Sequence, residues 1–224
     1  MTLYSLPDRV GLFIFDLDCT LYTNPRYAQA QTDVLIERLA IARGQNEKTM
    51  LAEVEAYRAA WSEQNGGRKL SLGNAFVAFG VPIEQSIRWR KEAIHPEMYL
   101  KTDPKLVAAL ARLSRIARLA VVTNNPVSIA NRTLAALGVR NRFHSIIGLD
   151  TCGVSKPHRA PFLKAAEELD VLPRHCISVG DRYDIDIALP LELGMGGILV
   201  EGVEDVYRLP DLDGLPPPCD AERP

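Results

Sequence analysis

The sequence predicts an α/β protein in which a doubly wound parallel sheet is interrupted by an inserted helical segment. Short, nearly continuous apolar runs indicate strands that helices cover on both faces. Helical patterns alternate with these runs in the second half of the chain, as in successive strand–helix–strand units. A long interval after the first run, by contrast, contains helical patterns alone. The predicted strands are residues 12–15, 119–122, 145–147, 176–179 and 198–200.

The inserted segment follows the first strand, and we expect four helices in it. Gly44, Gly66 and Gly80 lie in the connectors between these helices. The segment is far longer than the roughly 2–6 residues that usually join a strand to a helix. We therefore expect residues 23–99 to pack as a helical domain, and residues 1–22 and 100–224 to form the α/β core. The predicted helices are residues 28–42, 48–61, 71–79 and 84–93.

Three further helices are predicted between the later strands. Residues 104–117 carry apolar side chains at helical spacing, and residues 127–137 precede Gly138, a typical helix terminator. Residues 161–169 precede the fourth strand. Pro190 lies where the next helix is expected, so it should begin a new helix or kink this one.

The composition is that of an ordinary globular protein, with 47% apolar and 24% charged residues. The net charge of −2, from 26 basic and 28 acidic residues, gives no support for binding nucleic acid or an anionic membrane. No apolar run approaches the roughly 20 residues of a membrane span.

Four scattered cysteines form no metal or disulfide pattern. We expect a cytoplasmic protein with reduced thiols, as a monomer or homodimer. The proline-rich segment 215–218 should be extended and poorly packed.

Two aspartates follow the first predicted strand. Asp16 and Asp18 come directly after the apolar run, and Thr20 follows two residues later. Ligands of parallel α/β sheets bind at the carboxyl ends of the strands. Burying a carboxylate costs several kcal/mol unless a cation or hydrogen bonds compensate it. A strand that served packing alone would not end in this way.

Polar side chains follow later strands as well. Thr123 and Asn124 come after the second strand, and Lys156 precedes a proline ahead of the fourth. Gly180 and Asp181 follow the fourth strand. Because parallel strands present their carboxyl ends at one edge of the sheet, these groups should converge there. The expected set is Asp16, Asp18, Thr123, Lys156, Asp181 and one of Asp184 or Asp186.

This set of side chains suits the binding of a metal ion and a phosphate group. Two carboxylates about 4 Å apart repel by ~4 kcal/mol at an effective dielectric constant of 20, so several together require more positive charge than Lys156 supplies. A hard divalent ion, most simply Mg²⁺, would balance them. The Thr123 hydroxyl and the Asn124 backbone N–H could then donate to a phosphate. Taken alone, Lys156 would be a solvated surface residue.

The chain resembles the haloacid dehalogenase superfamily, in the branch with a helical C1-type cap after the first motif. The first family motif, D-x-D-x-T, matches residues 16–20, and the second matches Thr123. The third, a lysine before proline, matches Lys156, and the fourth, Gly-Asp with a later acid, begins at Gly180. The motif of residues 15–22, followed by an all-helical insertion, resembles the pyrimidine 5′-nucleotidase-like and phosphoglycolate phosphatase-like branches. Cys19 stands where relatives usually have Gly or Asn.

The resemblance implies a Rossmann-like core and a phosphoryl-transfer mechanism. Asp16 would be the nucleophile that becomes an aspartyl-phosphate. Asp18 would protonate the leaving oxygen and then accept a proton from the hydrolytic water. The carboxylates of Asp16 and Asp181, with the backbone carbonyl of Asp18, would hold Mg²⁺.

The same resemblance implies roles for the remaining motif residues. Thr123 and Lys156 would bind the phosphoryl oxygens, and Thr20 would support the loop of the first motif. Asp186 has the common spacing of the second acid of the fourth motif, which completes the metal site. Asp184 is the competing candidate.

These residues predict a Mg²⁺-dependent phosphatase acting on a small phosphomonoester, such as a nucleotide, a sugar phosphate or a phosphoglycolate-like ester. Asp18 argues against a dehalogenase, which has no alcohol leaving group to protonate. A phosphomutase of the same superfamily uses the same motifs and stays an alternative, since it differs in how the cap excludes water. A phospho-receiver or binding protein ranks lower, because receivers lack both D-x-D-x-T and a long helical insertion.

Overall fold

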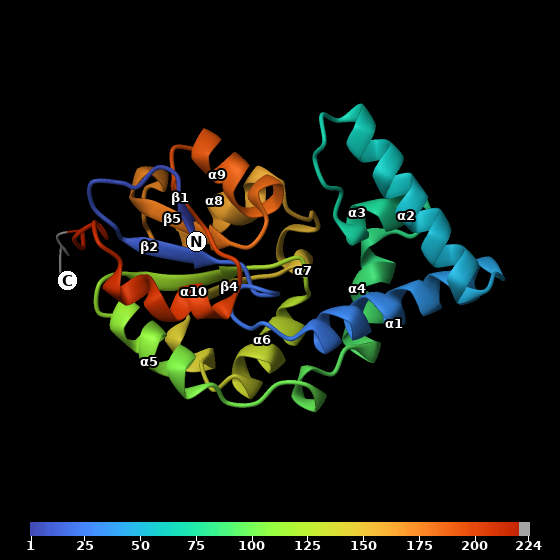
Figure 1. Ribbon diagram of the computed structural model, residues 1–224, viewed down its shortest axis with the longest axis horizontal. Helices are drawn as coiled ribbons and strands as arrows, with labels where there is room; N and C mark the ends of the chain where they lie inside the picture. Colours follow the sequence, from blue (N-terminus) through green and yellow to red (C-terminus); the bar gives the residue numbers. More distant parts are fainter. Residues whose placement is uncertain (220–224) are drawn as a thin grey trace.

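The computed structural model describes residues 1–219, in which six strands form one sheet between two layers of helices (Figure 1). The strand order is β1-β6-β5-β2-β3-β4; neighbours from β6 to β4 are parallel, and β1 pairs antiparallel with β6. The predicted doubly wound α/β core is confirmed. The strands are β1 (Thr2–Leu3), β2 (Leu12–Phe15), β3 (Arg118–Val122), β4 (Ser145–Ile147), β5 (Cys176–Gly180) and β6 (Gly196–Leu199).

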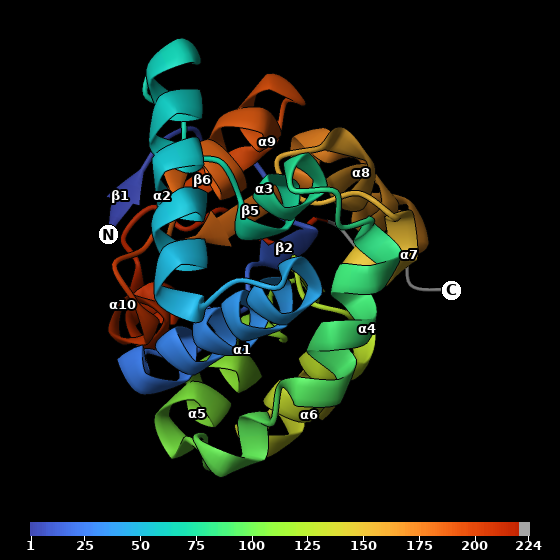
Figure 2. The ribbon, with the colours of Figure 1, turned by 90° about the vertical axis from the view of Figure 1, so that its right-hand side faces the viewer.

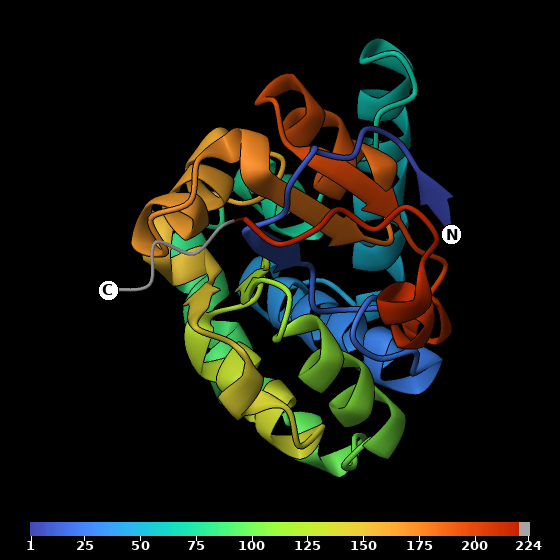
Figure 3. The ribbon, with the colours of Figure 1, turned by 90° about the vertical axis from the view of Figure 1, so that its left-hand side faces the viewer.

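The central strand β2 is buried on both faces because its side chains alternate between the two helix layers. Phe13 and Phe15 pack in the cluster formed with α5 (Pro104–Leu113), α6 (Val127–Ala136) and α10 (Val203–Arg208). Leu12 and Ile14 pack in the opposite cluster, with α8 (Arg159–Glu168) and α9 (Ala188–Glu192). Figure 3 shows both layers from the end of the sheet remote from the inserted helices. Shorter helical turns are α7 (Leu149–Cys152), Pro96–Met98, Arg140–Arg142, Pro173–His175 and Leu209–Asp211.

The strand register brings three strand ends to the same level. Phe15 of β2 lies opposite Val121 of β3 on one side and opposite Val179 of β5 on the other. The residues that follow these strands therefore emerge side by side at one edge of the sheet.

Four helices lie over that edge (Figures 1 and 2). They are α1 (Pro25–Arg43), α2 (Glu47–Gln64), α3 (Leu72–Ala78) and α4 (Ile83–Ala93). All four were predicted, and each end differs from its predicted position by less than about one helical turn. Side chains of Asn24, Asn46 and Ser71 cap the first three. The four helices share a hydrophobic cluster separate from the two clusters of the sheet, with Phe76 and Trp89 among its buried members.

Two strands differ from the prediction by more than one residue at an end. Strand β1 was not predicted, since two residues are too few to carry a recognisable pattern. Strand β6 begins at Gly196 rather than at residue 198. Gly196 and Gly197 have no apolar side chain to mark a strand, yet a Cβ at Gly196 would lie 2.7 Å from the carbonyl oxygen of Ser5. Glycine at this position therefore allows the N-terminal segment to pack against the sheet edge.

Pro190 and the proline-rich segment 215–218 both contact the core. Pro190 lies in the first turn of α9, where a missing N–H disrupts no helical hydrogen bond, and a π-helical turn, Tyr183–Ile187, precedes it. The expectation of a poorly packed tail is wrong for Leu215 and Pro216, which are partly or fully buried, whereas Pro217 and Pro218 are exposed. The segment is extended, but the N–H of Val10 donates to the carbonyl of Pro217 at 2.9 Å, and the N–H of Cys219 donates to Val10 at 2.9 Å. These bonds hold the tail against the segment that leads into β2.

Candidate active site

The carboxyl edge of the sheet gathers the predicted polar residues. Asp16 follows β2, Thr123 follows β3 and Asp181 follows β5. Lys156 reaches the same place from the loop between α7 and α8, and its amine is buried against two carboxylates. The convergence expected from the strand pattern is therefore present.

Lys156 forms a buried ion triad with Asp16 and Asp186. Its Nζ lies 2.6 Å from Asp16 Oδ1 and 2.6 Å from Asp186 Oδ1, and only 1% of the lysine is exposed. Burial by itself would lower the pKa of this amine, but the charges of Asp16 and Asp186 raise the pKa of Lys156 above its ordinary value. The lysine therefore stays charged and holds both carboxylates in place.

Three carboxylates are arranged to hold a cation. One oxygen each from Asp16, Asp181 and Asp186 lies within 4.8 Å of the others. Asp181 Oδ1 is buried without a hydrogen-bond partner, and burial, followed by the charge of Asp16, raises the pKa of Asp181 to about 7. A buried oxygen that accepts no hydrogen bond is suited to a metal ligand. Carboxylate oxygens are the donors that hard divalent cations prefer, so this group fits such an ion.

The position of Asp186 depends on Gly180. A Cβ at Gly180 would lie 2.4 Å from the Cβ of Asp186, so a larger residue would displace the carboxylate. The π-helical turn then directs Asp186 inward, where its Oδ2 also accepts the N–H of Arg182 at 3.2 Å. Asp184, in the same turn, lies outside the three-carboxylate group.

The loop of the first motif has a strained backbone at Cys19. Cys19 has φ = 62°, in the left-handed region that glycine and asparagine adopt most easily. Its thiol is not activated, since burial and then the charge of Asp181 raise the pKa of Cys19 to about 11. Thr20 is buried next to the loop, with its Oγ1 3.5 Å from Asp16 Oδ2.

Asp18 is held apart from the three-carboxylate group by hydrogen bonds. Its Oδ1 accepts the hydroxyl of Tyr22 and, at 3.1 Å, Nε2 of Gln31. Its Oδ2 accepts Nδ2 of Asn125 at 2.8 Å. Burial and the nearby charge of Asp16 raise the pKa of Asp18. The side chain is thereby suited to carry a proton rather than to bind a cation.

The residues after β3 organise the lysine loop. Thr123 is buried, and its Oγ1 accepts the N–H of Asn125 at 3.1 Å. The side chain of Asn124 holds the backbone of Lys156: Oδ1 accepts its N–H at 2.7 Å, and Nδ2 donates to its carbonyl at 3.3 Å. From the sequence, only the backbone N–H of Asn124 was expected to take part in the site, as a donor to a phosphate. In the structure its side chain also holds the backbone of Lys156.

Comparison with known proteins identifies the family. The family model of haloacid dehalogenase-like hydrolases matches residues 10–193, a span that contains the whole acidic group and Lys156. The chain belongs to this family of hydrolases. It is 28% identical to the glyceraldehyde 3-phosphate phosphatase of Methanopyrus kandleri over 94% of this chain and 92% of that protein. It is also 28% identical to the phosphoglycolate phosphatase of Escherichia coli over 78% of this chain and 75% of that protein.

Solved structures of the family share the fold. The HAD phosphatase from Thermococcus onnurineus superposes with a TM-score of 0.59 at 20% identity, covering 85% of this chain and 86% of that one. Within residues 1–219 of this hydrolase, no helix has the length and apolar character needed to cross a membrane.

The inserted helices of this hydrolase supply residues that the sequence analysis did not identify. Gln31 of α1 donates to Asp18, and its Oε1 accepts Nδ2 of Asn125 at 3.0 Å. Arg90 of α4 donates from Nη1 to Asn125 Oδ1 at 3.0 Å. Asn125 directly follows Thr123 and Asn124, so its position in the sequence could have placed it among the candidate site residues. The sequence spacing of Gln31 and Arg90 does not relate them to the motif residues, because only the tertiary fold brings their helices to the core.

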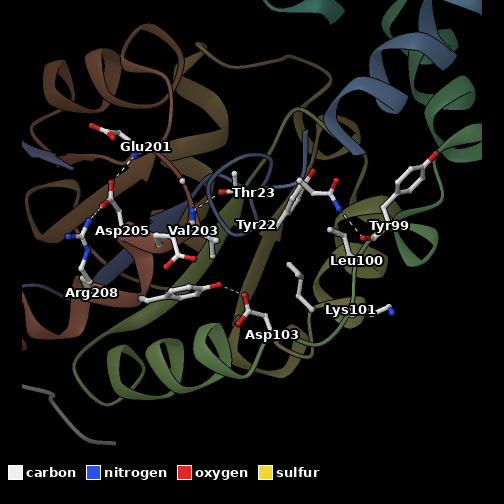
Figure 4. A pocket seen from close by; sticks show the side chains of 15 residues that line it. Tyr22, Thr23, Tyr99, Leu100, Lys101, Asp103, Glu201, Val203, Asp205 and Arg208 are labelled. Atoms are coloured by element: carbon white, nitrogen blue, oxygen red, sulfur yellow. Dashed lines mark hydrogen bonds and ion pairs between the residues drawn. The ribbon is translucent and has the colours of Figure 1, made fainter. Parts of the chain in front are cut away.

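A cavity lies beside the two linkers that join the inserted helices to the sheet (Figure 4). It has a volume of about 650 Å³ and is bordered by Thr23, Tyr99 and Asp205, with none of the predicted carboxylates in its lining. Thr23 Oγ1 accepts the N–H of Val203 at 3.0 Å, which ties the first linker to α10. This cavity therefore belongs to the linkers rather than to the acidic site.

Proposed function

We propose that this hydrolase is a Mg²⁺-dependent phosphatase that cleaves a small phosphomonoester through an aspartyl-phosphate intermediate. The observation that carries the proposal is the placement of Asp16 in contact with Lys156 and beside two further carboxylates, with Asp18, whose pKa is raised by burial, two residues along the chain. Relatives named as phosphatases support the reaction class. A nucleotide, a sugar phosphate or a phosphoglycolate-like ester would suit a small site.

In this proposal, residues 23–99 form a cap over a core made of residues 1–22 and 100–224. Polar contacts link the two parts: Ser155 donates to Asn74 Oδ1 at 2.6 Å, and Gln31 and Arg90 reach Asn125. A cap in this position would exclude water and large substrates from the acidic group.

The chemical steps use residues already in contact. A carboxylate oxygen of Asp16 attacks phosphorus, and the bond from phosphorus to the leaving oxygen breaks. Asp18 gives its proton to that oxygen, and in the second step it accepts a proton from the water that attacks the aspartyl-phosphate. Water adds to phosphorus, inorganic phosphate leaves, and the carboxylate of Asp16 is regenerated.

Fixed charges would stabilise the transferring group. Lys156 and the hydroxyl of Thr123 would bind the phosphoryl oxygens, with the backbone N–H of Asn124 as a further donor. Asp16, Asp181 and Asp186, with the backbone carbonyl of Asp18, would hold Mg²⁺, which supplies charge neutralisation for the phosphoryl group. Thr20 would support the loop that carries Asp18.

The test is phosphate release from p-nitrophenyl phosphate and a panel of metabolites, with Mg²⁺ or with EDTA. We expect metal-dependent release by the wild type and a loss of at least about 1,000-fold in Asp16→Asn, because the nucleophile is gone. Asp170→Asn, at an exposed position, is the matched control. Release that survives in Asp16→Asn would refute the mechanism. Conversion of a sugar monophosphate without phosphate release would indicate a mutase instead.

A further inference from the structure

Arg90 is a buried cation that forms no direct ion pair with any described residue. It lies on α4, only 8% of the residue is exposed, and Nη1 donates to the neutral amide of Asn125. Its Nε is buried without a hydrogen-bond partner, and no carboxylate of residues 1–219 lies within ion-pair distance of it. The adjacent Lys91 does pair with an acid, at 2.9 Å from Asp150. Burying an unpaired charge is unfavourable, so an anion is expected to complete this site.

The guanidinium remains charged at neutral pH. Burial lowers the pKa of Arg90 to about 10, and the charge of Asp18 opposes this effect. A pKa of about 10 keeps the side chain protonated under ordinary conditions. Arg90 is therefore a permanent positive charge held in a buried place.

Arg90 borders a cavity that opens onto the proposed reaction centre. The cavity has a volume of about 260 Å³ and is lined by Asp18, Asp181 and Asn125 from the core, and by Gln31 and Arg90 from the inserted helices. Arg182 also lines it, but that guanidinium has Asp181 as a counter-ion at 3.7 Å. Arg90 is thus the cation in this lining that is free to take an anion from outside.

The position of Arg90 relative to Asp18 indicates which part of a substrate it would meet. Asn125 touches both residues: Nδ2 donates to Asp18 Oδ2 at 2.8 Å, and Oδ1 accepts from Arg90 at 3.0 Å. Asp18 is the proposed proton donor to the leaving oxygen. Lys156, on the other side, is already paired with Asp16 and Asp186. Arg90 therefore lies on the side of the leaving group.

We propose that the leaving group of the substrate carries a second anion, a carboxylate or a second phosphate, which Arg90 binds. This inference rests on the proposed phosphatase function and narrows it to one class of esters. A guanidinium recognises both kinds of anion with paired N–H donors. The small cavity favours a compact leaving group over a nucleoside.

The test compares esters that differ in the charge of the leaving group. Phosphoglycolate carries a carboxylate there, propanediol bisphosphate carries a phosphate, and hydroxyethyl phosphate carries a neutral hydroxyl. We expect wild-type kcat/KM for one of the two anionic esters to exceed that for the neutral ester by about 100-fold, the size expected for a charged hydrogen bond. The favoured anionic ester identifies the source of the anion.

Arg90→Met should abolish this preference, so that the ratio of kcat/KM for the favoured anionic ester to kcat/KM for hydroxyethyl phosphate falls from about 100 to about one. Arg90→Lys, which keeps the charge but not the paired donors, should retain part of it, and it replaces Arg90→Met if that variant does not fold. Arg88→Met is the matched control, because Arg88 is exposed on the same helix. An equal loss on all three esters would show that Arg90 only positions Asn125 and would overturn the inference. Equal wild-type rates on the three esters would overturn it too.

A binding measurement separates this inference from the proposed function. Calorimetry of the same three esters with Asp16→Asn, with and without Arg90→Met, reports recognition without turnover. Preferential binding of an anionic ester that disappears with Arg90→Met would support the role of Arg90 even if the wild type releases no phosphate from these esters, p-nitrophenyl phosphate or the metabolite panel, a result that would refute the phosphatase. Hydrolysis of the neutral ester without any such preference in binding would retain the phosphatase and refute the role of Arg90.

Discussion

Asp186 and Asp184 illustrate how one turn of backbone places two acids in different surroundings. The two acids are two residues apart in the π-helical turn after β5, and each was a candidate for the metal site. Asp186 is buried, contacts Lys156 and belongs to the three-carboxylate group, whereas Asp184 is half-buried and lies outside it. The geometry therefore favours Asp186 as the second acid of the fourth motif.

Substituting each acid separately tests this choice. We expect Asp186→Asn to lower phosphatase activity by at least about tenfold, because it removes a cation ligand and half of the charge that pairs with Lys156. Asp184→Asn should stay within about twofold of wild type, since the half-buried Asp184 lies outside the three-carboxylate group. The measurement is kcat/KM at several Mg²⁺ concentrations. The opposite ranking would assign the metal site to Asp184.

Helix α1 is tied to both linkers through its first residues. Asn24 Oδ1 accepts the N–H of Tyr27 at 3.0 Å and caps the helix, while Nδ2 donates to the carbonyl of Tyr99 at 3.0 Å. One side chain thus joins the outgoing linker to the returning one. Helix α2 has a simpler cap, in which Asn46 Oδ1 accepts the N–H of Thr49 at 2.8 Å.

Replacing these caps should have unequal effects on stability. Asn46→Ala should lower the free energy of unfolding by about 1 kcal/mol, the usual value for a lost helix cap. Asn24→Ala should lower it by about 1 kcal/mol more, because the bond to Tyr99 is lost as well. Asn24→Asp keeps the cap and removes the Nδ2 donor, so it should fall between wild type and Asn24→Ala. Urea denaturation measures all three, and equal values for Asn24→Ala and Asn46→Ala would show that the bond between the linkers contributes nothing.

At the scale of the whole molecule, the acidic site opposes folding unless a cation is bound. Asp16, Asp181 and Asp186 place three carboxylates around one buried lysine. Mg²⁺ at 100 times its Kd should raise the free energy of unfolding by about 2.7 kcal/mol, because it binds the folded chain alone. Thermal unfolding with MgCl₂, against NaCl of equal ionic strength, measures the effect. An identical Tm in the two salts would contradict it.

The pH dependence of this stabilisation follows from Asp181. Its folded pKa of about 7 lies above the ordinary value of 3.8. The stability that its proton contributes to the metal-free protein is therefore complete below about pH 4 and is lost as pH rises through 7. A cation must displace that proton, so the rise in Tm caused by Mg²⁺ should be larger at about pH 8 than at about pH 6. An equal rise at both values would show that Asp181 does not hold the ion.

The sequence by itself determined the local features of this protein. Strands β2 and β4 have the predicted bounds, since a continuous apolar run of a few residues suits a strand buried on both faces. The positions of Asp16, Thr123 and Asp181 followed from the same pattern, because parallel strands deliver the residues after them to one edge. The four inserted helices were also predictable, as periodicity and caps are properties of neighbouring residues.

Tertiary structure alone decided how distant segments meet. The contacts of Asn125 with Gln31 of α1 and Arg90 of α4 join three parts of the chain that no periodicity relates. The choice of Asp186 over Asp184 depended on a π-helical turn and on the close approach of Gly180, neither of which a residue pattern specifies. Apolar periodicity records which side of an element is buried, but not which element covers it. The acidic centre was therefore predictable from the sequence, and the side chains that the inserted helices bring to it were not.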